Sequence, residues 1–122
     1  MIESYFLEVE TVLQAFSNIR TYVLKKKVYN SSQGYIGRSI FFENGHQLDF
    51  IEVKHVDFAD KIKYRYQYMD EEQSLIFRYD NAPHHKHIAT FPHHKHTPIG
   101  IIACAEPTLR DVLFKIAQII HK

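Results

Sequence analysis

Both ends of the chain carry the residue spacing of amphipathic helices. Near the N-terminus, large apolar residues recur every three or four positions with polar residues between them. They are Tyr5, Phe6, Val9, Val12, Leu13 and Phe16. Residues 109–120 repeat this pattern, and Thr108 with Asp111 forms a capping pair just after Pro107. The sequence therefore predicts one helix at each end of the chain.

The part of the chain between these helices alternates as strands do. In residues 61–68 the alternation is clearest, because Tyr64, Tyr66 and Tyr68 share one face while charged and polar residues occupy the other. Turn sequences separate the apolar runs, and Asn44-Gly45 is typical of a tight hairpin. Five strands are predicted, at residues 19–29, 35–43, 47–56, 61–68 and 75–80.

Short turns between consecutive strands favour an antiparallel meander, and two amphipathic helices can cover one face of it. The predicted fold class is α+β: an N-terminal helix, about five strands, a long histidine-rich loop and a C-terminal helix. No linker divides the chain, so residues 1–122 are expected to form a single domain. The loop spans residue 81 to about 101, and loops of that length in compact domains are usually functional or disordered.

Composition narrows the location of the protein. The chain has 122 residues, of which 45% are hydrophobic and 24% charged, as in ordinary soluble globular proteins. The single cysteine, Cys104, excludes an internal disulfide and suits a reducing compartment. The sequence shows no signal peptide and no apolar run that could span a bilayer. We therefore expect a cytoplasmic protein that does not engage membranes.

The predicted loop contains the pentapeptide Pro-His-His-Lys-His twice, at residues 83–87 and 92–96. The formal net charge of +1 counts all nine histidines as neutral, although imidazole titrates near neutral pH. Six of the nine lie in this loop: His84, His85, His87, His93, His94 and His96. The loop can therefore carry more positive charge than the formal count shows.

One interpretation of this loop is acid–base cleavage of RNA without a metal or other cofactor. Such cleavage needs a base, an acid and cations that stabilise the charged phosphorus centre. Histidine can serve in both proton-transfer roles, Arg78 and Lys95 supply fixed charge, and Asp80 can hold a histidine tautomer. Tyr64, Tyr66 and Tyr79 could stack exposed bases. The catalytic candidates are His84, His85, His93, His94, His96, Arg78, Asp80 and Lys95.

Two other interpretations stay open. Histidines can hold a transition metal, and the candidate ligands are His84, His87, His94 and His96. However, their spacing matches no standard structural zinc site, and Asp80 is the only acidic residue between Glu72 and Glu106. Alternatively, the histidines are solvated loop residues and the alternating tyrosines pack in the core.

The runs LIFRYDNAPHH (residues 75–85) and TFPHHKH (residues 90–96) together resemble the signature of the TumE family. These are small bacterial and archaeal proteins assigned as toxins of toxin–antitoxin modules. The resemblance covers the second half of the chain well, and the first half only in layout. Where many members carry histidine, this chain has Gln67. The resemblance implicates Arg78, Asp80, Asn81, His84, His85, His93, His94 and His96, but not Lys86 or His87.

Together these observations predict the toxin of a type II toxin–antitoxin module, acting as a metal-independent endoribonuclease. Asn81 joins the three tyrosines as an expected substrate-binding residue. The resemblance implies a cognate antitoxin, usually a small helix-turn-helix DNA-binding protein. An edge strand of the meander could also pair with a second copy to give a homodimer. The alternatives are a metal-binding protein or enzyme and a non-enzymatic inhibitor or interaction module.

Overall fold

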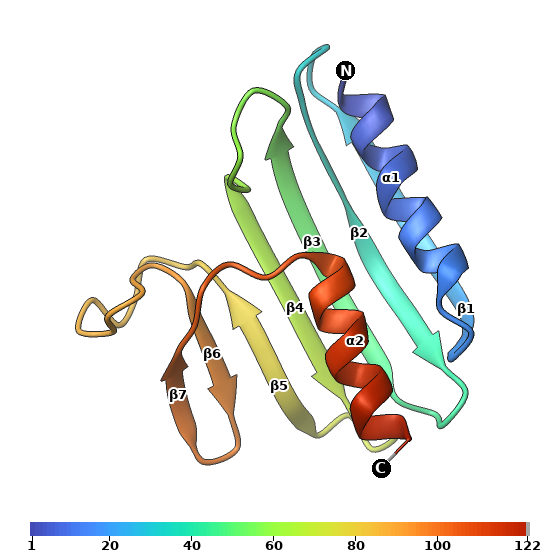
Figure 1. Ribbon diagram of the computed structural model, residues 1–122, viewed down its shortest axis with the longest axis vertical. Helices are drawn as coiled ribbons and strands as arrows, with labels where there is room; N and C mark the ends of the chain where they lie inside the picture. Colours follow the sequence, from blue (N-terminus) through green and yellow to red (C-terminus); the bar gives the residue numbers. More distant parts are fainter. Residues whose placement is uncertain (122) are drawn as a thin grey trace.

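The protein folds as a seven-stranded antiparallel sheet with one helix near each end of the chain (Figure 1). The structure is a computed structural model and describes residues 1–121. The elements are α1 (Ile2–Ala15), β1 (Ile19–Val28), β2 (Gln33–Phe42), β3 (Gln47–His55), β4 (Lys63–Met69), β5 (Leu75–Asp80), β6 (His94–Thr97), β7 (Gly100–Ala103) and α2 (Leu109–Ile120). Every strand pairs with its neighbours in the chain, so the predicted α+β meander is confirmed.

The sheet has two strands more than the five predicted, because the end of the expected loop forms the hairpin β6–β7. Strand β6 has only four residues and no apolar alternation, so nothing in its composition marks it as a strand. Its pairing with β5 places His96 opposite Arg78 and His94 opposite Asp80. Two of the six loop histidines, His94 and His96, therefore belong to the sheet, and residues 81–93 alone form the long connection.

Both helices cover the same face of the sheet. In Figure 1, α1 lies in front of β1 and β2, and α2 lies in front of the middle strands. The predicted tyrosine face of β4 is buried beneath them, since Tyr64, Tyr66 and Tyr68 are at most 1% exposed. Within residues 1–121 no helix covers the opposite face, which we call the open face. The helix side of this core comprises Ile2, Phe6, Val9 and Leu13 from α1 and Leu109, Val112, Leu113 and Ile116 from α2.

Helix α2 begins with the predicted capping box. The Thr108 side chain accepts a hydrogen bond from the Asp111 backbone N–H, and the Asp111 carboxylate accepts one from the Thr108 N–H. Two amide groups that a helix start would otherwise leave unpaired are thereby satisfied. Within residues 1–121 neither helix has the length and apolar character that crossing a membrane requires.

The core beneath the helices contains one buried carboxylate. Glu52 on β3 is 1% exposed and accepts hydrogen bonds from the hydroxyl groups of Tyr5 and Tyr66. Burial and the neighbouring carboxylate raise the pKa of both tyrosines above the usual value of 10, so both hydroxyls stay protonated as donors. A buried charge is costly unless hydrogen-bonded, so these two donors keep Glu52 compatible with the core.

Replacing Tyr66 with phenylalanine should lower the free energy of unfolding by about 1–3 kcal/mol, because Glu52 loses one of its two donors. Denaturant titration would measure the change. Tyr22→Phe is the control, since the half-buried Tyr22 hydroxyl makes no hydrogen bond within residues 1–121. Equal stability of the two variants would show that the Tyr66–Glu52 bond contributes nothing.

Candidate functional site

Asp80, the last residue of β5, lies at the centre of a polar cluster on the open face. It is 7% exposed, and its Oδ1 lies 2.8 Å from His94 Nε2 and accepts a 3.1 Å hydrogen bond from the Ala82 N–H. Its Oδ2 accepts a 3.1 Å bond from Arg78 Nε and lies 3.4 Å from His96 Nε2. One carboxylate therefore holds together β5, β6 and the start of the long connection.

Strand geometry explains why these side chains meet. Residues two apart on a strand share a face, so Arg78 and Asp80 both point to the open face. Cross-strand partners also share a face, and the partners on β6 are His96 and His94. On the other side, β4 places Arg65 opposite Asp80. Strand register thus brings together the groups around Asp80, whereas His84 and His85 reach the site from the long connection.

His94 is enclosed and has both ring nitrogens engaged. It is 1% exposed, with Nδ1 2.9 Å from the Pro92 carbonyl oxygen and Nε2 against Asp80. Both partners accept hydrogen bonds, so forming both bonds at once requires an N–H at each nitrogen. The arrangement fits His94 as the partner that fixes Asp80, and it leaves no ring nitrogen free for substrate.

His96 and His85 face each other beside this pair. The ring of His85 lies 5.8 Å from that of His96 and 5.3 Å from that of His94 between centroids. Burial and the nearby Arg78 charge lower the pKa of His96 below its usual value of 6.5, while Asp80 acts in the opposite direction. His85 has φ of 57°, which is uncommon outside glycine, and its ring makes no hydrogen bond within residues 1–121.

These side chains border a cavity of about 620 Å³ on the open face. The charged residues and histidines in its lining are Lys63, Arg65, Arg78, Asp80, His84, His85, His94 and His96. The single carboxylate is already paired with Arg78 and His94, whereas Lys63 and Arg65 make no ion pair within residues 1–121. An excess of positive charge in a cavity attracts anions. The lining therefore suits an anionic ligand.

Lys95 and His93 do not reach this cavity. Lys95 alternates with His94 and His96 on β6 and points to the helix face, where its ammonium nitrogen lies 5.0 Å from the centre of the Tyr79 ring. His93 stacks on Tyr64, with Nδ1 2.9 Å from the tyrosine hydroxyl. The structure thus places Lys95 and His93 apart from the histidines that line the cavity.

The predicted substrate-binding residues are largely engaged within the fold. Tyr64 and Tyr66 are buried under the helices, and Tyr79 points to that same face, so these rings offer no surface on the open face for base stacking. Asn81 lines the cavity, but its amide accepts from the Tyr64 N–H at 3.0 Å and donates to the Ile62 carbonyl at 3.2 Å. Its contacts fix the long connection to β4.

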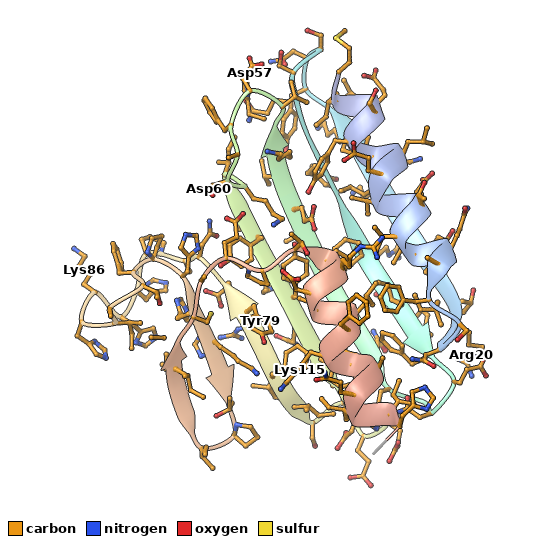
Figure 2. All side chains as sticks on the ribbon, in the orientation of Figure 1. Arg20, Asp57, Asp60, Tyr79, Lys86 and Lys115 are labelled. Carbon is orange, nitrogen blue, oxygen red and sulfur yellow. The ribbon has the colours of Figure 1, made fainter. Side chains whose placement is uncertain are left out.

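The histidines proposed as metal ligands do not form one group. The ligand nitrogens of His85, His94 and His96 all lie within 4.8 Å of one another, whereas His84 and His87 are outside this set. His84 borders the cavity without joining this set, and His87 directly follows Lys86, which lies at the tip of the connection, away from the sheet (Figure 2). If the site holds a metal, His85 takes the place expected for His84 or His87.

Two basic residues of the cavity, Lys63 and Arg65, were absent from the candidates drawn from the sequence. Their signal was present in the alternation of β4, which puts both on the face opposite the buried tyrosines. What the sequence does not state is the register that sets Arg65 beside Asp80. Only the pairing of β4 with β5 shows that Arg65 lies opposite the site carboxylate.

Residues 9–121 match the model of the protein family described as Toxin TumE. The chain belongs to the TumE family. The match extends well beyond the second half of the chain, where the resemblance in sequence was strongest. Neither the search of curated proteins nor that of solved structures found a match. Membership of the TumE toxin family implies, in general terms, an antitoxin partner.

The pKa of His96, followed by NMR titration of its ring, should lie below 6.5, and Arg78→Gln should move it back toward that value. Arg78→Lys is the control, because it keeps the positive charge. Since folded His96 binds its proton less readily than the unfolded chain, its contribution to stability is lost as pH falls from about 6.5 through the lowered pKa. A wild-type value above 6.5 would show that Asp80 outweighs burial and Arg78.

Proposed function

We propose that this protein is the toxin of a type II toxin–antitoxin module and cleaves RNA without a metal. The observation that carries the proposal is the facing pair His85 and His96, set in a cavity whose unpaired charges are positive. A phosphodiester is an anion, and histidine exchanges protons near neutral pH. Membership of the TumE family supports the toxin role, and the cavity supports the RNA substrate.

In the proposed reaction His96 is the base. Its lowered pKa keeps the ring neutral at pH 7, and an Nε2–H directed at Asp80 leaves the lone pair on Nδ1. The 3.4 Å contact with Asp80 is long for a hydrogen bond, as such contacts often are before substrate binds. His96 takes the proton of a ribose 2′-hydroxyl, and the freed oxygen attacks the adjacent phosphorus.

His85 then completes the transfer as the acid. As the bond between phosphorus and the 5′ oxygen breaks, the electron pair stays on that oxygen and protonated His85 supplies its proton. The products are a 2′,3′-cyclic phosphate and a 5′-hydroxyl, so no oxidant, water or metal is consumed. Arg65 and Arg78 stabilise the negative charge on the phosphoryl oxygens, in the role first expected of Lys95.

His96→Ala and His85→Ala should each lower RNA cleavage by about 10²–10⁴-fold, as loss of a general acid or base does. Cleavage of a defined single-stranded RNA by purified protein in EDTA would measure this effect. The product ends should carry a cyclic phosphate, and the wild-type rate should be bell-shaped in pH.

His121→Ala is the matched control, because His121 follows α2 and bonds to Asn18, remote from the cavity. If His85→Ala and His96→Ala cleave as fast as this control, the assignment of base and acid is wrong. If expression of the wild-type protein arrests growth but the purified protein leaves RNA intact, the toxin acts by another route, such as occupying a target.

A second candidate function is metal-dependent chemistry, favoured by the grouping of three ligand nitrogens at His85, His94 and His96. The bond between His94 Nδ1 and the Pro92 carbonyl resembles the support that metal-bound histidines receive, and Asp80 lies beside His94. Imidazole nitrogens suit zinc, copper, iron and nickel.

This alternative predicts about one metal ion per chain after dialysis, measured by elemental analysis, and loss of that metal in the double variant His85→Ala/His96→Ala. Changing His84 and His87 together is the matched control and should retain the metal, since both lie outside the ligand group. Cleavage that persists at full rate in EDTA with metal-free protein would reject metal-dependent chemistry.

A further inference from the structure

A second cavity, of about 560 Å³, lies beside the histidine cavity. Lys25, Tyr35, Ile51 and Arg65 line it, and Arg65 also lines the first cavity. Because one arginine borders both spaces, they are neighbours in the sheet rather than separate sites. Apart from Arg65, the residues that line the second cavity have no part in the reaction proposed above.

Strand register explains how the two cavities connect. Pairing across the sheet sets one residue of each strand in a transverse row, which runs Lys25, Gly37, Ile51, Arg65, Asp80, His94. Four strand spacings separate Lys25 from Asp80, which is about 19 Å. The row therefore leads from the first strand of the sheet directly to the carboxylate at the centre of the histidine site.

Gly37 leaves the hollow in this row. A Cβ atom at this position would lie 2.2 Å from the Phe50 carbonyl oxygen, so no other residue fits without moving backbone. The missing side chain lowers the surface between Lys25 and Ile51. Tyr35, two positions before Gly37, is only partly buried, and its ring lies 6.1 Å from that of Tyr29.

Along this surface the basic side chains are unpaired, whereas the carboxylate of the second cavity is hydrogen-bonded. Lys25 and Arg65 are exposed, and within residues 1–121 neither forms an ion pair. The second cavity's carboxylate, Asp49, already accepts hydrogen bonds from Ser39 and Gln47. The surface therefore presents cations to a ligand while its acidic group is occupied.

We infer that single-stranded RNA binds along this row, with the strand passing from the histidine cavity over Arg65 into the hollow at Gly37. The inference rests on the proposed function for the reaction at one end, and it adds the path of the substrate. Cations spaced across the sheet bind phosphates at intervals along the strand, and Tyr35 offers an aromatic face for a base. A duplex would hide its bases from this surface.

Charge complementarity favours RNA over a protein partner at this face. The row has unpaired cations at Lys25 and Arg65, and the aromatic ring of Tyr35 borders the same cavity, which is the combination that single-strand binders use. Lys27 extends the basic surface, since it pairs with Tyr35 and points the same way as Lys25. Lys26, between them, points to the helix face and binds Glu10 at 2.6 Å.

Because Lys25 and Lys27 point to the open face and Lys26 to the helix face, positive charge can be removed from one face at a time. Binding of a fluorescent, 2′-O-methylated single-stranded RNA would be measured by anisotropy at several salt concentrations for wild type and for Lys25→Gln/Lys27→Gln. Loss of two phosphate contacts should weaken binding about tenfold near physiological salt and make the slope of log K against log salt shallower by about 1.4. A duplex of the same sequence should bind wild type more weakly than the single strand.

The matched control is Lys26→Gln/Lys115→Gln, which removes the same charge from the helix side, where Lys115 lies on α2 (Figure 2). Equal weakening by both double variants, or by neither, would overturn the inference, as would equal affinity for the duplex. If the open-face pair instead weakens only capture of the cognate antitoxin, the face is a protein interface and the inference is wrong. Because the probe lacks the 2′-hydroxyl, binding with this pattern would stand even if cleavage failed.

Discussion

The geometry of the histidine cluster depends on the contact between Asp80 and His94. This contact joins β5 to a strand of four polar residues that buries little apolar surface of its own. Without a partner, the buried carboxylate and the buried imidazole would each be costly, so each makes the other tolerable. Their pairing fixes β6, and β6 in turn sets His96 beside Arg78. A polar contact thus holds β6 in place, whereas apolar packing holds the strands that lie under the helices.

The sheet places the apolar core on one face and the candidate site on the other. On β4, Tyr64 and Tyr66 are buried under the helices, while Arg65 between them is exposed on the open face. The same alternation sends Lys95 to the helix face and its two histidine neighbours to the other. Since successive residues of a strand cannot share a face, the site and the core are encoded in the same short segments. The open face keeps the site and a row of cations free of the helices.

The sequence predicted what depends on apolar periodicity and on the family motif. Both helices, the capping box and five strands follow from apolar spacing and turn residues, whereas β6 and β7 lack that pattern and were taken for loop. The misplacement of Lys95 follows from this, because alternation can be applied only to a segment known to be a strand. Arg65 was missed for a related reason: its place beside Asp80 is a matter of register, which pairing fixes. The motif nonetheless contained Asp80 and the histidines that the fold brings together.

The two chemistries considered for the site make incompatible demands on the same nitrogens. Acid–base cleavage needs a free lone pair on His96 and a proton on His85, whereas a metal held by His85, His94 and His96 would occupy all three rings. The 2.8 Å separation of His94 Nε2 and Asp80 Oδ1 also needs a proton, or a cation bound beside them, since two lone pairs at that distance repel. His94 Nδ1 is likewise directed at the Pro92 carbonyl oxygen, so both of its ring nitrogens face acceptor oxygens. Only the rings of His85 and His96 then remain to bind a metal, so this geometry favours proton transfer over coordination.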